Sequence, residues 1–453
     1  MSEKVNVLIV SDNIITNTGV ANQTAEIAKA LFNKEYGVYQ IGVGGMEPAK
    51  QFLHTFPTGE QVQIVTDNTY DNVPLYFHLI HEHNIKAVIL VTDPHKFLQV
   101  WINARTIKNL VPIIYWNLWD TNLLPTSKSQ KAHYNQWIYE SCDSLPCISQ
   151  QSENFVKQIL NDLPQDRRPK VSYIPHGSNE FIFKPLPKDA VETHRETFFR
   201  GKKYEYVVLF NGRNQTRKKA TDLIYAWQQF FSGLSMEQSA KVALVLHTEA
   251  VTQVGTDLNE VIAALAPDTN IYIDYVKRTQ EELNILYNIS DVTFNVSNAE
   301  GFGLPIQESL LAGTPIAATV TGGLQDQMGF NDDTGKPMTF NKEFTSNATH
   351  IYGKFFNYGE WCKPIFPVAQ EIIGSPATPY LFNDVIDHDG IKDALLYWYK
   401  VPREERKERG LKGREYCYKN NMTTTALGEL FTKEVADTIY NFKKHELFTL
   451  YKA

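Results

Sequence analysis

Two carboxylates stand eight residues apart, at Glu300 and Glu308, on either side of the glycine-rich turn Gly301-Phe302-Gly303. The apolar run Val292–Val296 before the turn is typical of a buried strand, and residues 307–312 after it favour a helix. A strand, a Gly-x-Gly turn and a helix N-terminus form an anion site, because the free N–H groups and the helix dipole both face the ligand.

The glutamates add hydroxyl recognition to this anion site. Carboxylates accept hydrogen bonds from hydroxyls, and a helix N-terminus holds a diphosphate, so the stretch suits a sugar nucleotide. The alternative is a Rossmann-like strand–turn–helix whose two glutamates share no role.

The pattern Glu300-Gly-Phe-Gly-Leu-Pro-x-x-Glu308, followed by Gly-Thr-Pro, resembles the signature of the retaining GT-B glycosyltransferases, specifically family 4. The resemblance implies a metal-independent enzyme that moves a sugar from a nucleoside diphosphate to an acceptor hydroxyl with retained configuration. It implies that Glu300 approaches the transferred sugar and Glu308 the ribose hydroxyls. It also implies donor contacts from Gly301, Phe302, Gly303 and Leu304.

A basic segment supplies the cations that such a donor needs. By resemblance, Arg213 and Lys218 hold the diphosphate and neutralise the leaving group, and Lys219 is a rival for Lys218 in a register shifted by one residue. Cations at the start of the following helix oppose its dipole, which favours a functional role over a solvated face.

Two further loops belong to the donor side by resemblance. Gly19 would let a backbone N–H approach the phosphate, although a simple N-terminal turn would look the same. Val276, after the predicted strand Ile271–Tyr275, is the residue expected to contact the base. We expect a UDP- or GDP-linked donor and no cofactor.

The acceptor side is expected on loops of the first half. Many relatives have His-Asp where this chain has Trp119-Asp120, and Asp120 is expected to orient a hydroxyl. Trp116 and Trp119 either stack on a sugar or base or belong to the core. His95, on another strand-end loop, is a further candidate.

Short apolar runs alternate with helical patterns along the chain, which predicts an α/β fold of GT-B type with two Rossmann-like domains across a cleft. The predicted domains are 1–185, on the acceptor side and joined by the C-terminal helix 423–453, and 186–422, which binds the nucleotide sugar. A connector rich in Pro, Lys and Glu spans about 175–203, and residues 325–382 are interpreted as an elaboration of the second domain.

The expected strands fall into two groups. They are Val5–Val10, Ala87–Val91, Val111–Tyr115 and Val171–Ile174, then Tyr206–Phe210, Val242–Leu246, Ile271–Tyr275, Val292–Val296 and Pro315–Ala318.

The composition, with 43% hydrophobic and 21% charged residues in 453, is that of an ordinary globular protein. No apolar run approaches the roughly 20 residues of a membrane helix, and the N-terminus resembles a strand and not a signal peptide. Four cysteines without zinc spacing indicate buried thiols and a cytoplasmic location. The run Asp387-His388-Asp389 is interpreted as a solvated loop and not as a metal site.

The distribution of charge along the chain does not decide which acceptor the protein uses. Residues 165–219 carry 13 Lys and Arg against 6 Asp and Glu, while the whole chain has a net charge of −7. A glycan, lipid or small-molecule acceptor is the main hypothesis. A viral-type enzyme acting on hydroxymethylated DNA bases is one alternative, favoured by the basic stretch and disfavoured by the overall acidity. A non-catalytic sugar-nucleotide-binding module is the other, disfavoured because the whole set of glutamates and cations is present.

Overall fold

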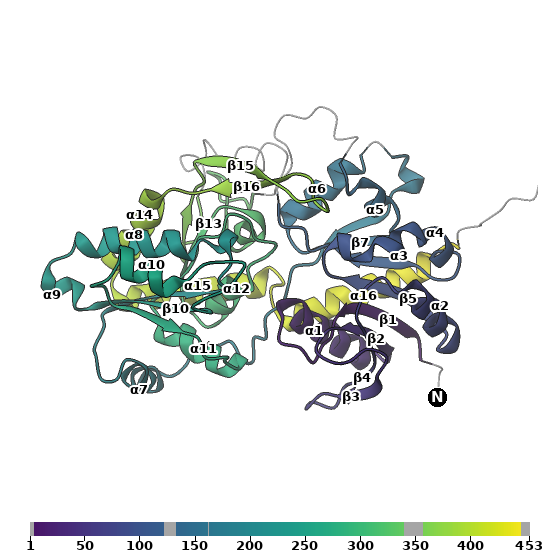
Figure 1. The fold of residues 1–453 in the computed structure, drawn as a ribbon, viewed down its shortest axis with the longest axis horizontal. Helices are drawn as coiled ribbons and strands as arrows, with labels where there is room; N and C mark the ends of the chain where they lie inside the picture. The colour runs from purple at the N-terminus through teal and green to yellow at the C-terminus, as the bar shows by residue number, and fades with distance from the viewer. Residues whose placement is uncertain (1–3, 122–132, 162, 339–356, 445–453) are drawn as a thin grey trace, which may run out of the picture.

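The computed structural model describes residues 4–121, 133–161, 163–338 and 357–444. They form two α/β halves that lie side by side, the N-terminal half on the right of Figure 1 and the C-terminal half on the left. The last predicted helical residues, 445–453, and residues 339–356 of the predicted elaboration lie outside the described residues.

The described part of the N-terminal half contains an eight-stranded sheet of order β3-β4-β2-β1-β5-β6-β7-β8, parallel except for the β3–β4 pair. Its strands are β1 (Asn6–Asp12), β2 (Gly37–Val43), β3 (Gln51–Thr55), β4 (Gln61–Asp67), β5 (Ile85–Val91), β6 (Ile113–Trp116), β7 (Ser144–Cys147) and β8 (Lys170–Tyr173). Its helices include α1 (Gly19–Asn33), α2 (Val73–Glu82), α3 (Leu98–Ile102), α4 (Ala104–Ile107), α5 (Gln136–Glu140) and α6 (Gln150–Ile159).

In the described part of the C-terminal half, six parallel strands follow the order β11-β10-β9-β12-β13-β14. These strands are β9 (Tyr206–Asn211), β10 (Val242–His247), β11 (Ile271–Asp274), β12 (Val292–Asn295), β13 (Ile316–Thr319) and β14 (Cys362–Ile365). The helices are α7 (Lys188–Phe198), α8 (Ala220–Ser232), α9 (Met236–Ser239), α10 (Leu258–Leu265), α11 (Gln280–Ile289), α12 (Leu304–Leu311), α14 (His388–Lys400) and α15 (Arg403–Lys419). A hairpin of β15 (Ala369–Ile373) and β16 (Leu381–Val385) stands apart from this sheet.

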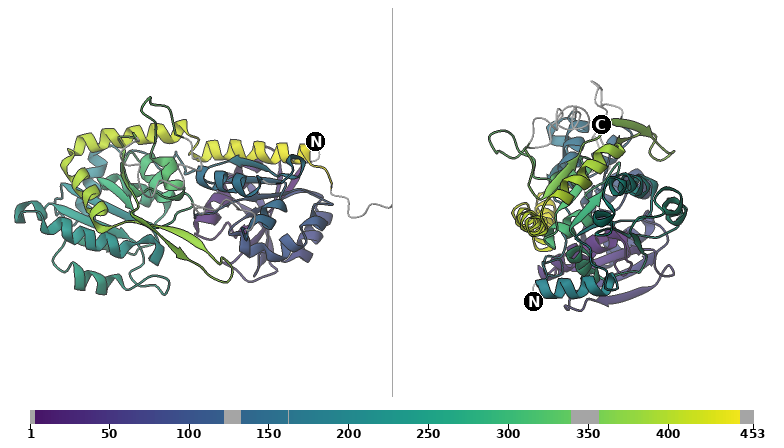
Figure 2. Two further views of the ribbon diagram at one scale, coloured as in Figure 1. Left: turned by 90° about the horizontal axis from the view of Figure 1, so that it is seen from above. Right: turned by 90° about the vertical axis from the view of Figure 1, so that its left-hand side faces the viewer.

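The last described helix, α16 (Thr424–Asn441), returns to the N-terminal half and packs on α1 (Figure 2). Phe431 of α16 lies with its ring 5.2 Å from that of Trp116, and both side chains are fully buried. An ion pair adds to this contact, because the exposed side chain of Lys170 of β8 lies 2.9 Å from the buried Glu434 of α16.

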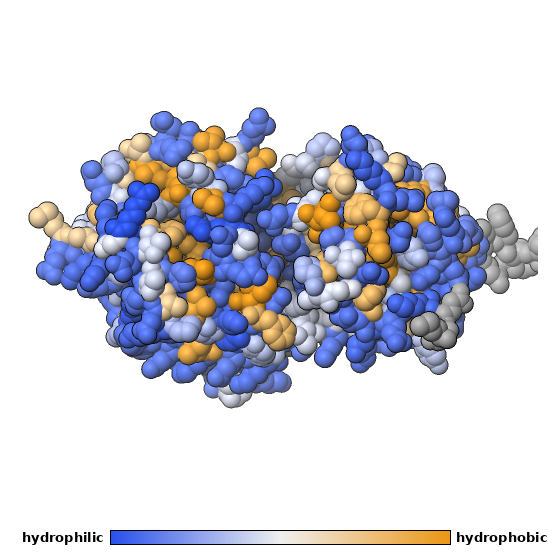
Figure 3. All heavy atoms as spheres, turned by 90° about the horizontal axis from the view of Figure 1, so that it is seen from below, coloured by the Kyte–Doolittle hydropathy of each residue, from blue (hydrophilic) through white to orange (hydrophobic). Residues whose placement is uncertain are grey.

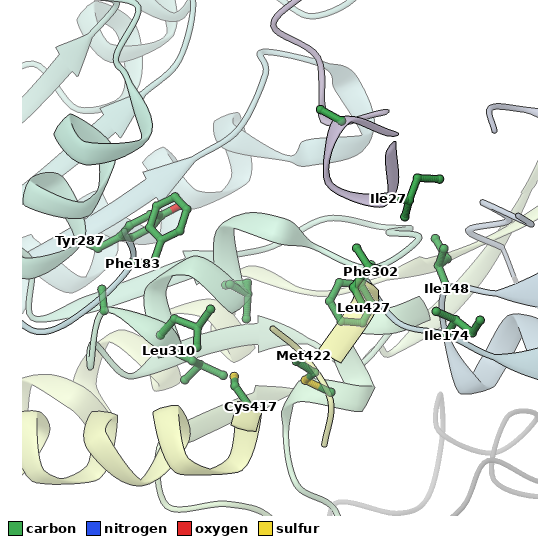
Figure 4. Packing of buried hydrophobic residues seen from close by; sticks show 14 of the residues in the cluster. Ile27, Ile148, Ile174, Phe183, Tyr287, Phe302, Leu310, Cys417, Met422 and Leu427 are labelled. Atoms are coloured by element: carbon green, nitrogen blue, oxygen red, sulfur yellow. The ribbon is translucent and has the colours of Figure 1, made fainter. Parts of the chain in front are cut away.

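One hydrophobic cluster continues from one half into the other (Figure 4). Phe302, in the turn before α12, lies close to Leu427 of α16 and to Ile148 and Ile174 of the N-terminal half. Burial of apolar surface on both sides of this boundary holds the halves against each other, since each buried side chain contributes about 1.5–3 kcal/mol.

The nine expected strands are present within two residues at each end. The structure adds α7 inside the predicted connector, whose buried face is only Val191 and Arg195, too sparse a pattern to recognise. It also adds β2, β3, β4, β7 and β14, which the sequence analysis did not assign.

All four cysteines fall within the described residues, where they are buried and form no disulfide. No helix in these ranges is long and apolar enough to cross a bilayer. The described residues also contain no group of three or more His, Cys, Asp or Glu side chains arranged for a metal ion.

We predict that Phe431→Ala lowers the free energy of unfolding by about 3–5 kcal/mol, because it opens a cavity between α16 and Trp116. Urea denaturation followed by tryptophan fluorescence measures it. Tyr440→Ala, on the same helix but with Tyr440 89% exposed, is the control and should change stability by less than about 0.5 kcal/mol. Equal losses in both variants would show that α16 is not docked through Phe431.

Candidate active site

The site lies where the carboxyl ends of the parallel strands meet. Gly303 precedes α12 with φ of 91°, a left-handed conformation that glycine adopts without strain, and a Cβ there would clash with Leu324. The backbone can therefore turn sharply from β12 into α12. This places Glu300 in the loop and Glu308 in the second turn of α12.

Glu300 accepts three polar contacts on one oxygen. Lys218 Nζ forms an ion pair with Glu300 Oε2, Arg217 Nη1 lies 3.5 Å from the same atom, and Ser297 Oγ donates to it at 3.3 Å. Arg217 also donates to the carbonyl of Ala299 at 2.7 Å. The cations of the loop after β9 thus meet the carboxylate of the loop after β12.

Burial and charge compete at this cluster. The side chains of Lys218 and Glu300 are only 13% and 12% exposed. Burial alone would raise the pKa of Glu300, but Lys218 and Arg217 outweigh it and hold that pKa below its ordinary value. Burial works against charge on Arg217 as well, yet Glu300 and Asp120 raise the pKa of Arg217 above its usual range.

The structure brings Arg217, and not the expected diphosphate ligand Arg213, beside Lys218 at Glu300. Arg213 is 67% exposed, with Nε 3.5 Å from Glu249 Oε1. Thr216–Lys218 form a 3-10 turn, which points Arg217 and Lys218 toward Glu300. Lys219 follows in the left-handed conformation, with φ of 55°, and caps α8.

Asp120 faces this cluster from the N-terminal half. Its Cβ lies 3.7 Å from the position that a Cβ on Gly301 would take. Burial raises the pKa of Asp120, while the positive charges of Arg217 and Lys218 act against that rise. Gly19, at the start of α1, similarly faces α12, because a Cβ there would lie 3.6 Å from Leu304 Cδ1.

Glu308 lies in a chain of hydrogen bonds. Tyr287 Oη donates to Glu308 Oε2 at 2.6 Å, and Asn211 Nδ2 donates to Tyr287 Oη at 2.7 Å. Burial raises the pKa of Glu308 to about 7, although the Tyr287 hydrogen bond and the nearby His247 favour the carboxylate. Glu308 as a whole residue is of intermediate exposure.

The loop after β11 leaves Val276 54% exposed. Asp274, the last residue of β11, accepts a hydrogen bond from Arg278 Nε at 2.6 Å and contacts His247 Nδ1 at 2.9 Å. Burial opposes the ionised form, but these hydrogen bonds lower the pKa of Asp274 to about 2. The ends of β10 and β11 are thereby joined, and the base contact of Val276 stays a prediction.

The three acceptor candidates, Trp116, Trp119 and His95, differ in their burial. Trp116 is fully buried, and its indole N–H donates to the carbonyl of Ile174 at 3.2 Å, so the predicted acceptor contact is wrong for this residue. Trp119 is 7% exposed and stacks on Phe155 with ring centroids 5.9 Å apart, which places it in the core as well. His95 is exposed in a 3-10 turn after β5.

Basic residues of the stretch 165–219 lie at several places in the described structure. Arg167 and Arg168 border a pocket of about 630 Å³ together with Arg105 and Lys108, below α4. Lys188 and Arg195 border another beside α15. Within the described part of this stretch, Arg217 and Lys218 are the residues that contact Glu300. The choice between nucleic acid and other acceptors stays a prediction.

Comparison with known proteins finds one family model and one curated relative that resemble part of this chain. Residues 193–336 match the family model described as glycosyl transferases group 1. Mannosylfructose-phosphate synthase of Agrobacterium fabrum is 28% identical over 212 residues, which cover 45% of this chain and 44% of that protein, so the match spans under half of the curated relative.

Solved structures match over nearly the whole chain. Sucrose-phosphate synthase of Thermosynechococcus elongatus has a TM-score of 0.67 at 14% identity, covering 96% of this chain and 100% of that one. HepE of Anabaena, solved with UDP and glucose, has a TM-score of 0.62 at 13% identity over 96% and 100% of the two chains. The fold is therefore the GT-B fold, as expected, and the match to the glycosyl transferases group 1 model lies within the C-terminal half.

Lys218 and Glu300 should be energetically coupled, because each side chain is only 12–13% exposed. Removing one of them leaves the charge of the other with less compensation. We predict that Lys218→Met and Glu300→Gln each destabilise the protein, while the double variant loses less than their sum by at least about 1 kcal/mol. Urea denaturation at pH 7 measures all four proteins. Additive losses would show that the two side chains do not interact.

Proposed function

We propose that the protein is a glycosyltransferase that moves a sugar from a nucleoside-diphosphate sugar to an acceptor hydroxyl. The observation that carries the proposal is the contact of Lys218 and Arg217 with Glu300 at the start of α12. These cations and the helix N-terminus suit a diphosphate, and the carboxylate suits sugar hydroxyls. The match of residues 193–336 to glycosyl transferases group 1 supports the same function.

Departure of the nucleoside diphosphate concentrates negative charge on the leaving oxygen. Arg217 and Lys218 are held in place by Glu300, so they can stabilise that charge without reorganising. We propose retention of configuration, with the acceptor oxygen attacking from the face that the diphosphate leaves and a phosphate oxygen taking its proton. Asp120, from the opposite half, then orients a hydroxyl, and no metal is needed.

A uridine nucleotide is the donor we favour. HepE, which shares the fold, was solved with UDP and with UDP-glucose. In this chain Glu308 lies in the second turn of α12 and can accept from ribose hydroxyls, and Val276 is exposed for a base. The acceptor is a glycan, lipid or small molecule, and we propose that the enzyme works in the cytoplasm, where buried thiols stay reduced.

A donor screen tests the proposal. The protein is mixed with UDP-, GDP-, ADP- and dTDP-sugars without acceptor, and release of free nucleotide is followed. We expect slow hydrolysis of one donor. The rate should fall 100-fold or more in Glu300→Ala and about 100-fold in Arg217→Ala, because removal of one group that stabilises charge in a transition state has an effect of this size.

Arg213→Ala is the matched comparison, since Arg213 lies on the same loop but contacts Glu249. Its loss should be at least tenfold smaller than that of Arg217→Ala. A reversed order would return the diphosphate role to Arg213. Absence of any donor hydrolysis and any donor-induced thermal shift would contradict the proposed function.

The raised pKa of Glu308, about 7, predicts a pH dependence of donor binding. Its carboxyl is about nine-tenths protonated at pH 6 and nine-tenths ionised at pH 8, and the ionised form accepts from both ribose hydroxyls. Donor affinity, measured by calorimetry, should rise about tenfold from pH 6 to pH 8. Glu308→Gln should abolish this rise, and a slope that persists in the variant would assign it to another group.

A further inference from the structure

The hairpin β15–β16 connects the two halves of the molecule. It belongs to the C-terminal half by sequence, and in Figures 1 and 2 it extends from that half toward α5 and α6 of the other. Its strands pair antiparallel: Ala369 lies opposite Val385 at one end, and Ile373 lies opposite Leu381 at the other. The sequence analysis treated this region only as an elaboration of the second domain.

The root of the hairpin is fixed to the loop that carries Glu300. The backbone N–H of Asp384 donates to the carbonyl of Asn298 at 2.9 Å, and Asn298 Nδ2 donates to Glu371 Oε1 at 3.2 Å. Asn298 is 2% exposed and stands two residues before Glu300. Movement of β16 therefore moves the backbone that leads into the catalytic loop.

The tip of the hairpin is fixed to the other half. Tyr134 Oη donates to the carbonyl of Tyr380 at 3.0 Å, and the two rings pack edge to face with centroids 5.0 Å apart. Tyr134 and His133 in turn pack on Trp119, with centroids 6.0 and 6.2 Å away. Trp119 precedes Asp120, so the tip rests on the segment that positions this carboxylate.

We infer that the hairpin is a clasp, with Tyr380 as a positioning residue that holds the Asp120 loop against the Glu300 loop. Contacts between domains of one chain permit relative motion by default, and separation of these halves would have to break the Tyr380 contacts. The clasp thereby keeps Asp120 beside the cations of the C-terminal half. The expected effect of the clasp on turnover rests on the proposed function, whereas its expected effect on the radius of gyration does not.

Three variants test the clasp. Tyr380→Ala removes the ring packing, and Tyr134→Phe removes only the hydrogen bond to the tip. Ile372→Ser is the matched control, because Ile372 lies on the same hairpin but is 69% exposed. The measurements are the radius of gyration by small-angle X-ray scattering, the affinity for UDP, and turnover of the donor found in the screen.

For Tyr380→Ala we expect a larger radius of gyration and about tenfold slower turnover, since small misplacements of reacting groups are costly. UDP affinity should change less than about twofold, because Arg217 and Lys218, the cations proposed to hold the diphosphate, both lie in the C-terminal half. Tyr134→Phe should show a smaller change in the same direction, and Ile372→Ser none.

Unchanged scattering and turnover in Tyr380→Ala would overturn the clasp. A loss of UDP affinity as large as the loss of turnover would also overturn it, because the hairpin would then be part of the donor site. If Tyr380→Ala does not fold, Tyr134→Phe decides by the same criteria. If the unaltered protein turns over no donor, the proposed function fails while scattering still decides the clasp.

Discussion

A buried carboxylate must be compensated, and Glu300 is the buried charge on which this site depends. Leaving it unpaired would cost several kcal/mol, so the segment that supplies its cations has to lie within contact distance. The loop after β9 does so through Arg217 and Lys218, which are more than eighty residues away in sequence. The same constraint places two cations beside the loop that leads into α12, and cations near a helix N-terminus suit a diphosphate.

The site is complete only when the two halves meet. Asp120 and Gly19 come from the N-terminal half, and Glu300 and α12 from the other. The hydrophobic cluster around Phe302, the return of α16 onto α1 and the β15–β16 hairpin each join the halves at a different place. Seen from the side of Figure 3, two lobes remain distinct with a hollow between them.

The sequence was sufficient for the GT-B fold, because strand and helix periodicities are local and the Glu300–Glu308 motif is specific. It was insufficient for Arg217, since a 3-10 turn, and not spacing, decides which side chain of a basic run points inward. Burial of Trp116 depends on α16, which is more than 300 residues away. The bridging role of Tyr380 depends on a contact with Tyr134 that no local pattern encodes.

The most direct test of the account is the contribution of the diphosphate to binding. Calorimetry would compare UDP with uridine, and GDP with guanosine, in the unaltered protein and in Lys218→Ala. We expect the nucleotide of the preferred base to bind at least about 100-fold more tightly than its nucleoside, and Lys218→Ala to reduce this ratio about tenfold or more. An unchanged ratio in Lys218→Ala would show that the cluster around Glu300 is not where the diphosphate binds.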